Sequence, residues 1–376
     1  MKTILVCGAG GFIGSHLTRS LVEKGNRVIG VDIVNPEWST TTAEDFYILN
    51  LTDTTAVYNL FRTYDFDEVY QLAADMGGAG YIFTGDNDAA IMHNSASINL
   101  NIAEACVRHG KPNIKVFYTS SACIYPEYNQ LDPDNPTCEE SSAYPAEPDS
   151  EYGWEKLFSE RLYLAYQKNH GIDVRIARLH NIFGPESNFD GGREKAPAAL
   201  CRKVLQAEDI IEVWGPGTQT RSFLYIDECI EGIHRIMESD VKEPINLGSD
   251  RMISINGLVK MICEIAGKDL TIKNIDGPRG VMGRNSDNKM IKELLNWQPQ
   301  NNLEHGISET YKWISEQINK TKWIYESPDK GKTVYRRPFG APHHMRELYY
   351  ENVDGFGRSN RVYKETTEII QDISGM

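Results

Sequence analysis

Tyr152 and Lys156 are the residue pair in this sequence whose types and spacing most directly suggest chemistry. They lie four positions apart in a stretch predicted to be helical, so their side chains share one face. A phenol with a pKa of about 10 is a poor base at neutral pH, but a nearby ammonium stabilises the phenolate. The phenolate can then take a hydroxyl proton while a hydride leaves the same carbon. Ser121, which follows an apolar run, is placed to hydrogen-bond that hydroxyl.

A glycine-rich segment near the N-terminus is spaced to bind a dinucleotide. Gly8, Gly11 and Gly14 follow an apolar run and open an amphipathic helix in the order G-x-x-G-x-x-G. Backbone N–H groups and the positive end of a helix dipole suit a pyrophosphate at this point. Asp32 ends the next strand, where its carboxylate can accept hydrogen bonds from a ribose diol and repel a 2′-phosphate. We therefore expect NAD rather than NADP.

The expected cofactor contacts come from this loop, from the ends of the following strands and from the Tyr–Lys pair. They are Gly8, Gly11, Phe12, Ile13, Gly14, Asp32, Asp53, Leu72, Ala73, Tyr152 and Lys156. Asp53 is expected at the adenine end. A Tyr–Lys spacing of four is common by chance in a chain with 19 tyrosines. The catalytic interpretation of the pair therefore depends on the glycine loop that accompanies it.

The elements that must position these residues alternate between strand and helix patterns. Buried strands are predicted at 4–7, 26–32, 68–73, 115–119 and 174–179, and helices after Gly11, around 97–107 and from 152 to about 169. Continuous apolar strands that alternate with helices predict an α/β fold with a doubly wound parallel sheet of the Rossmann type. Residues 126–150 are expected to form a long irregular loop.

Three regions are expected along the chain. The predicted division is an NAD-binding domain over 1–180, to which 222–248 returns, a smaller substrate-binding lobe over 181–320, and an appendage of unknown role over 321–376. A length of 376 residues suits two domains.

Composition and charge exclude several classes of function. The chain is 40% hydrophobic and 24% charged, as is usual for a globular protein. Its 53 acidic and 39 basic residues give a net charge of −14, which disfavours nucleic acid and anionic membranes as partners. An anionic substrate therefore needs its own cluster of Lys and Arg.

The cysteines and apolar stretches indicate the compartment. Seven scattered cysteines without a C-x-x-C motif predict free thiols and a cytoplasmic location, and no histidine or cysteine spacing suggests a metal site. No stretch reaches the roughly 18 apolar residues of a membrane span.

Six further segments carry a resemblance to a known family. They are 72–78 (LAADMGG), 120–126 (SSACIYP), 180–185 (HNIFGP), 191–199 (GGREKAPAA), 219–223 (QTRSF) and 283–288 (GRNSDN). On these, the chain resembles the extended short-chain dehydrogenases/reductases of the NAD-dependent epimerase/dehydratase family, and within it the enzymes that invert GDP-mannose. The resemblance spans about residues 1 to 318. The segments with Cys123 and Lys195 are the discriminating ones.

The resemblance implies an isomerase that holds NAD tightly and forms a homodimer. Oxidation at C4 makes the hydrogens on C3 and C5 acidic, and the residues of the family that match Cys123 and Lys195 are the acid–base pair that inverts these carbons. The C4 ketone is then reduced again. The implied reaction converts GDP-mannose to GDP-L-galactose and GDP-L-gulose.

The expected substrate contacts combine backbone that allows close approach, the acid–base groups and cations for the diphosphate. They are Gly77, Gly78, Ser121, Cys123, Asn181, Glu194, Lys195, Lys203, Gln219, Arg221 and Arg284. Arg221, Arg284 and Lys203 are the candidates for the diphosphate, whereas His180 is expected to be structural.

Other interpretations stay open at this point. Cys123 by itself is also consistent with a small buried hydrophobe. Without the resemblance, Lys195 is consistent with a solvated loop lysine, and each arginine with a surface residue. The other candidate enzymes are a C4- or C5-epimerase of another nucleotide sugar, such as a GDP-heptose, and a 4,6-dehydratase. The dehydratases carry Thr-Asp-Glu where this chain has Ser-Ala-Cys. A non-catalytic NAD-binding scaffold would usually lack Tyr152 or Lys156.

Overall fold

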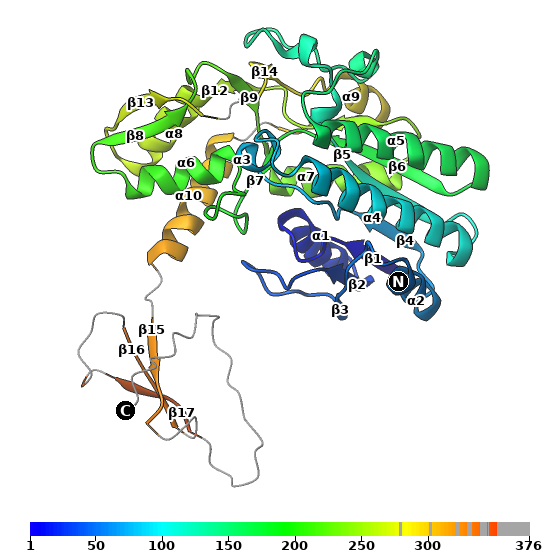
Figure 1. The fold of residues 1–376 in the computed structure, drawn as a ribbon, viewed down its shortest axis with the longest axis horizontal. Coiled ribbons are helices and arrows are strands. Elements are labelled where there is room, and N and C mark those ends of the chain that lie inside the picture. The colour runs from blue at the N-terminus through cyan, green and yellow to red at the C-terminus, as the bar shows by residue number, and fades with distance from the viewer. Residues whose placement is uncertain are drawn as a thin grey trace. The chain divides into compact units, whose positions relative to one another are not determined.

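The computed structural model describes most of the chain, drawn in Figure 1. The described residues are 1–277, 280–300, 303–319, 323–328, 333–338, 344 and 346–351. Residues 1–314 form one compact unit and residues 315–376 a second.

A seven-stranded, all-parallel sheet forms the centre of the first unit. Its strands, in spatial order, are β3 (Asp45–Ile48), β2 (Arg27–Asp32), β1 (Thr3–Cys7), β4 (Glu68–Gln71), β5 (Lys115–Ser121), β6 (Asp173–Leu179) and β11 (Ile245–Leu247). Successive strands are added outward from β1 on one side and outward from β4 on the other. The crevice between the carboxyl ends of β1 and β4 is therefore the topological switch point, where ligands bind in such folds. The predicted doubly wound Rossmann sheet is therefore confirmed.

Helices cover both faces of this sheet because the strands are apolar on both sides. Along β1, Ile4 and Val6 join one hydrophobic cluster whereas Leu5 and Cys7 join another, as the period of two requires. The first cluster includes residues of α1 (Phe12–Glu23) and α7 (Ile226–Glu238). The second includes α2 (Thr54–Thr63), α4 (Asp88–His109) and α5 (Glu151–His170).

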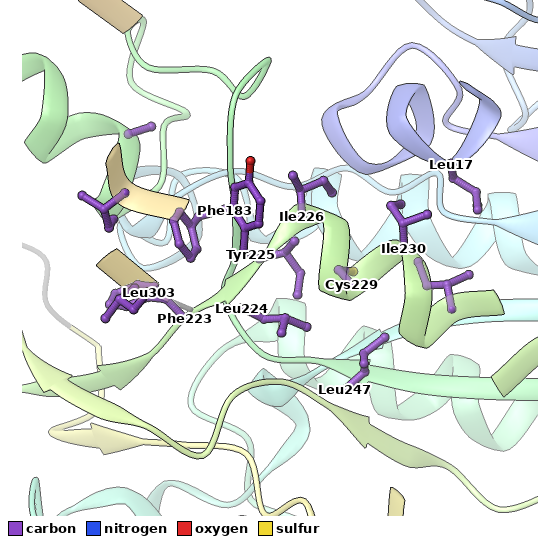
Figure 2. Close-up of a cluster of buried hydrophobic side chains, with 14 of the residues drawn as sticks. Leu17, Phe183, Phe223, Leu224, Tyr225, Ile226, Cys229, Ile230, Leu247 and Leu303 are labelled. Carbon is purple, nitrogen blue, oxygen red and sulfur yellow. The ribbon is translucent and has the colours of Figure 1, made fainter. Parts of the chain in front are cut away.

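Figure 2 shows how the first cluster joins distant parts of the chain. Leu17 of α1, Ile230 of α7 and Leu247 of β11 lie together there. Two short strands, β7 (Ile182–Phe183) and β10 (Leu224–Tyr225), pair in parallel beside it. Because β11 pairs with β6, the segment 222–248 returns to the edge of the seven-stranded sheet.

The remaining elements lie outside the seven-stranded sheet, and we call them the smaller lobe. Its helices are α3 (Ala79–Ile82), α6 (Ala196–Gln206), α8 (Ile255–Ala266), α9 (Lys289–Leu295) and α10 (Leu303–Asn319). Its strands are β8 (Ile210–Trp214) with β13 (Thr271–Ile275), and β9 (Thr220–Ser222) between β12 (Met252–Ser254) and β14 (Gly283–Arg284). Pairing of β14 with β9 brings Arg284 beside Arg221.

Several elements differ from the expectation. The loop 126–150 contains short 3-10 turns at Glu127–Gln130 and Glu140–Ala143, and another turn, Ala122–Ile124, precedes it. Strand β3 and helix α2 were not predicted. Strand β3 has only four residues, none of them buried, so its apolar pattern is weak.

The second unit contains a three-stranded antiparallel sheet within the appendage. Its strands are β15 (Trp323–Glu326), β16 (Thr333–Pro338) and β17 (Glu347–Glu351). Other residues of the appendage, among them 352–376, lie outside the described residues.

The described residues contain neither a candidate membrane-spanning helix nor a candidate metal site. Among their helices, none combines the length and apolarity that a bilayer crossing needs. In the same part of the chain, no three His, Cys, Asp or Glu side chains gather in a way that could hold a metal ion.

Candidate active site

One pocket at the carboxyl ends of the parallel strands contains every residue that the sequence proposes for substrate binding. Strand ends, α3, the start of α5 and the smaller lobe all contribute to its lining. The residues it brings together are Gly77, Gly78, Ser121, Cys123, Asn181, Glu194, Lys195, Lys203, Gln219, Arg221 and Arg284, together with Tyr152. Their roles remain predictions, but their convergence from segments up to about 200 residues apart does not follow from local sequence.

Tyr152 and Lys156 occupy the first turns of α5. The helix starts where the hydroxyl of Ser150 accepts a hydrogen bond from the Gly153 N–H at 3.3 Å. Tyr152 is 6% exposed, and the Lys156 ammonium lies 5.7 Å from its ring centroid. Lys156 Nζ donates to the carbonyl oxygen of Thr119 at 2.9 Å, which fixes the amine at the end of β5.

Burial is the largest influence on the pKa values of Tyr152 and Lys156. It raises the pKa of Tyr152 well above its ordinary value, with the charge of Cys123 acting in the same direction and a hydrogen bond from Ser121 opposing it. Burial also lowers the pKa of Lys156, against the attraction of Glu155. The sequence argument, in which Lys156 makes the phenol acidic, is thus incomplete. Further positive charge from bound groups must help stabilise the phenolate.

Cys123 lies beside Arg284, a contact that the sequence did not suggest. Arg284 Nη1 donates to Cys123 Sγ at 3.1 Å, Nη2 donates to Asp149 Oδ2 at 3.0 Å, and Nε donates to Gln130 Oε1. Arg284 is 5% exposed, and the charges of Cys123 and Asp149 outweigh burial and raise its pKa. Most of its donors are therefore directed at these groups, whereas we expected Arg284 at a diphosphate.

We expect Arg284→Gln to slow the alkylation of Cys123 by iodoacetamide by about three- to tenfold. The loss of the guanidinium removes the donor that holds the sulfur in place and the positive charge beside the reacting atom. Cys123 is the one cysteine of the seven that is not buried, so mass spectrometry can follow it selectively. Arg235→Gln, on an exposed face of α7, is the control. Equal rates in both variants would contradict the assigned contact.

Lys195 is the residue immediately before α6, and Pro197 lies in the first turn of that helix. Its side chain is largely buried, and within the described part of the chain it has no hydrogen-bond or ion-pair partner. Burial lowers its pKa, with Cys123 and Cys229 opposing that effect. A buried amine without a carboxylate partner is poised to exchange a proton with a ligand in the pocket.

We expect Lys195→Met to raise the thermal unfolding midpoint at pH 7 by about 2–4 °C, the shift that roughly 1 kcal/mol produces in a mid-sized domain. The native state disfavours the ammonium, so the unfolded chain binds more protons between the lowered pKa and the ordinary one near 10.5. In that window the wild type gains stability as pH rises. The advantage of Lys195→Met should therefore shrink with rising pH. Calorimetry at several pH values tests this, and an advantage that grows would contradict it.

The loop that carries Lys195 rests against α3. Gly191 and Gly192 have φ angles of 92° and 87°, which favour glycine. The Gly78 N–H donates to the Arg193 carbonyl at 3.0 Å, and a side chain at Gly78 would lie 2.2 Å from the Glu194 carbonyl oxygen. Close backbone contact at Gly78 thus allows the loop to place Lys195 at the pocket.

The glycine loop forms a tight turn between β1 and α1. Gly8 has a φ of 82°, and a Cβ on Gly14 would lie 1.9 Å from the Gly8 carbonyl oxygen. No side chain caps the start of α1 at Gly11. Uncapped N–H groups at the start of a helix are suited to bind a phosphate. Asp32 Oδ2 accepts from the Gly10 N–H at 2.9 Å, and burial raises the pKa of Asp32.

Comparison with known proteins identifies the family. The family model for the NAD dependent epimerase/dehydratase family matches residues 4–248. The chain belongs to the NAD-dependent epimerase/dehydratase family. GDP-mannose 3,5-epimerase of Arabidopsis thaliana is 48% identical over 322 residues, which are 85% of this chain and 84% of that protein. GDP-mannose 3,5-epimerase 1 of rice (Oryza sativa subsp. indica) is 47% identical, with 85% and 83% covered.

Solved structures of nucleotide-sugar epimerases share the fold. UDP-glucose 4-epimerase of Thermotoga maritima with UDP-glucose has a TM-score of 0.75 and 25% identity, and covers 84% of this chain and 100% of its own. UDP-glucuronic acid 4-epimerase of Bacillus cereus, in complex with UDP-glucuronic acid and NAD, has a TM-score of 0.69 and 27% identity, with 84% and 99% covered.

The residues of this epimerase/dehydratase fit NAD, its cofactor. The glycine loop leaves no space for a Cβ at Gly14, and Asp32 ends β2, the strand that pairs with β1. Leu72 and Ala73 follow β4 directly beside the loop, since Ala73 N would lie 2.9 Å from a Cβ on Gly8. Asp53 caps α2 by accepting from the N–H groups of Thr55 and Ala56, so its expected contact with the adenine end stays a prediction.

The other predicted residues of the pocket form hydrogen bonds within the protein. Asn181 donates to the Ser222 carbonyl oxygen at 3.0 Å, and Lys203 donates to the Glu212 carbonyl oxygen at 3.0 Å. Arg221 donates to the Thr220 and Val281 carbonyl oxygens, and burial lowers its pKa to about 10. His180 is buried against Asn246, and burial lowers its pKa to about 3, which suits the structural role expected of it.

Sequence reasoning missed several side chains at the pocket. Trp214 lines it, with the Lys203 ammonium 5.5 Å from its ring centroid. The side-chain amide of Gln219 donates from Nε2 to the Trp214 carbonyl oxygen at 2.9 Å. Its buried Oε1 has no hydrogen-bond partner among the described residues. Asp149 and Gln130 reach Arg284 from the long loop. Only the aromatic and polar character of these residues was visible in the sequence, and no spacing marked them.

Proposed function

We propose that this enzyme inverts C3 and C5 of GDP-mannose, giving GDP-L-galactose and, by inversion of C5 alone, GDP-L-gulose. The observation that carries the proposal is the convergence of Cys123 and Lys195 on the pocket that holds Tyr152. A C4-epimerase needs only the Ser–Tyr–Lys set and would leave this thiol and this partnerless amine without a task. The 48% identity to a protein named GDP-mannose 3,5-epimerase supports the same substrate.

The first task of the pocket is to handle the proton of the C4 hydroxyl. NAD, when bound, supplies an acceptor for the C4 hydride and gives it back at the end of the cycle. Tyr152 takes the hydroxyl proton during oxidation and returns it during reduction, while Ser121 hydrogen-bonds the same oxygen. Lys156, held by the Thr119 carbonyl, adds positive charge close to the phenol ring.

The second task is to invert carbons next to the C4 ketone. The ketone delocalises the negative charge left when a proton departs from C3 or C5, so a base of moderate strength suffices. One member of the pair Cys123 and Lys195 removes that proton from one face, and the other delivers a proton to the opposite face. The lowered pKa of Lys195 suits this exchange, because its neutral and charged forms lie closer in free energy than those of a solvated lysine.

The third task is to hold an anionic nucleotide on a protein whose net charge is −14. Arg221 and Lys203 supply positive charge at the pocket. The side-chain Oε1 of Gln219, which has no partner among the described residues, can accept a hydrogen bond from the ligand. The exposed ring of Trp214 offers a flat apolar surface to the base.

Incubation with GDP-mannose in deuterated water, followed by NMR, tests the reaction. Deuterium at both C3 and C5 of inverted products is expected, because each inversion passes through an exchangeable C–H bond. Label at C5 alone would indicate a single epimerisation, and an inverted C4 without label would indicate a C4-epimerase. GDP-heptoses in parallel reactions show which sugar is preferred. A folded, NAD-loaded enzyme that changes none of these sugars would contradict the proposal.

We further propose that the enzyme acts as a homodimer through α4 and α5. These helices pack against each other on the outside of the sheet, as Figure 1 shows. They expose Leu100, Trp154 and Phe158 at 43%, 40% and 46%. Such apolar side chains on adjacent helices favour a partner. Sedimentation should give twice the chain mass of 42.5 kDa, and Phe158→Glu should shift it to the monomer.

A cytoplasmic location is the remaining part of the proposal. All seven cysteines are free, and six of them are buried. A reducing compartment preserves such thiols, including that of Cys123. Fractionation of cells that express the tagged enzyme tests this location.

A further inference from the structure

We propose that Trp38, Phe189 and Trp313 form an aromatic clasp that retains NAD in the enzyme between turnovers. The clasp depends on the NAD dependence of the family and not on which sugar is inverted. It joins three segments that are far apart in sequence: the connection from β2 to β3, the segment after β7, and α10.

The contacts within the clasp are well formed. The ring centroids of Trp38 and Phe189 are 4.7 Å apart, and the Trp38 and Trp313 rings meet edge to face at 5.7 Å and 85°. Phe189 and Trp313 also meet edge to face, at 5.6 Å. The indole N–H of Trp38 donates to Asn188 Oδ1 at 3.0 Å. The two contacts of Trp313 have the preferred edge-to-face geometry, the Trp38 and Phe189 rings are tilted by 45°, and the hydrogen bond fixes the direction of the indole ring.

One arm of the clasp begins at the glycine loop. Asp32, at the end of β2, accepts from the Gly10 N–H at 2.9 Å, and a Cβ on Gly10 would lie 2.7 Å from the Val34 carbonyl oxygen. The chain that leaves β2 therefore passes directly over the glycine loop before it reaches Trp38.

The other arm runs along α1, the helix that the glycine loop opens. A Cβ on Gly184 would lie 3.4 Å from the Phe12 ring, and His16 Nε2 lies 3.2 Å from the Pro185 carbonyl oxygen. One turn further, Arg19 pairs with Glu186 at 2.8 Å. The segment after β7 is thus fastened to α1 just before it reaches the clasp.

Together these contacts make a continuous circuit around the start of α1. The circuit runs from the glycine loop through the β2–β3 connection to Trp38, and returns through 184–189 to α1. Three ring contacts and one hydrogen bond close the circuit at the clasp, so rotation of these side chains opens it. Retention suits an isomerase, because its cofactor is restored within each cycle and need not exchange.

The test measures NAD release in the absence of any sugar. Holoenzyme is mixed with excess NAD glycohydrolase, which destroys each released NAD molecule, and the protein-bound NAD is measured over time after denaturation. Trp38→Ala is expected to release NAD about tenfold faster than the wild type, as the loss of a partly buried aromatic contact implies. Trp313→Leu is expected to act in the same direction. The double variant should release NAD no faster than the more affected single variant, because one open clasp suffices.

Milder variants guard against misfolding. Trp38→Phe keeps a ring but loses the hydrogen bond, and Asn188→Ala removes only the acceptor. Both should accelerate release by about threefold, as the loss of one hydrogen bond implies. Trp297→Phe, at a tryptophan that stacks on Arg235 outside the clasp, is the matched control and should not change the rate.

Two results would overturn the clasp. The first is an unchanged release rate in folded Trp38 and Asn188 variants. The second is an equal acceleration in Trp297→Phe, which would indicate a general loosening of the fold. Because no sugar is present, neither result bears on the reaction proposed above. A failure of GDP-mannose to react would likewise leave the release rates intact.

Discussion

Tyr152→Phe should lower kcat by about 10³- to 10⁴-fold and abolish exchange of the sugar hydrogens with solvent. The variant keeps the ring, which is 6% exposed, and removes only the hydroxyl that takes the C4 proton. Without oxidation at C4 there is no ketone, so the hydrogens on C3 and C5 stay non-acidic. One missing oxygen atom is therefore expected to stop both parts of the reaction together.

Deuterium exchange and absorbance at 340 nm, which reports reduced cofactor, should both be lost in Tyr152→Phe. Bound NAD, the circular dichroism spectrum and the Kd for GDP-mannose should stay close to those of the wild type, because the ring still fills its site. Tyr128→Phe, at an exposed tyrosine whose hydroxyl donates to the Pro145 carbonyl, is the matched control. Retention of more than a tenth of the wild-type kcat would remove Tyr152 from the proton transfer.

The pH dependence of the same step follows from the raised pKa of Tyr152. The phenolate is the active form for oxidation, and burial disfavours it, so the rate of C4 oxidation should rise with pH across the neutral range. The slope should vanish in Tyr152→Phe.

Cys123→Ala should separate the two halves of the reaction. Inversion at C3 and C5 is expected to fall by about 10³-fold, since one of the two proton-handling groups is missing. Oxidation at C4 should continue, because Tyr152, Ser121 and Lys156 are unchanged. The variant should therefore show the 340 nm signal on addition of GDP-mannose with almost no deuterium incorporation.

Cys263→Ala, on α8 outside the pocket, is the control for loss of a thiol, and it should match the wild type in both measurements. Full epimerisation by Cys123→Ala would show that its acid–base role is wrong. Loss of the 340 nm signal together with exchange would show that the thiol contributes to C4 oxidation instead.

Local patterns were enough for the parts of the site that depend on neighbours in sequence. The period of the helix places Tyr152 and Lys156 on one face, and the glycine spacing determines the turn between β1 and α1. Continuous apolar strands predicted the parallel sheet, and that sheet is confirmed. The resemblance to a family contributed Cys123 and Lys195, which spacing alone did not distinguish from a buried thiol and a solvated lysine.

Contacts between distant segments were decided by the tertiary structure. Arg284 meets Cys123 across 161 positions because β14 pairs with β9, and a pairing of two residues leaves no readable pattern. Asp149 and Gln130 reach the same guanidinium from a loop without periodicity. The partnerless state of Lys195 and the meeting of Trp38 with Trp313 likewise depend on how the smaller lobe packs. The amino-acid sequence by itself determined the sheet, the cofactor loop and the Tyr–Lys pair, because periodicity acts over a few residues. Packing alone decided which cation faces the thiol, because that depends on the burial of segments far apart in the chain.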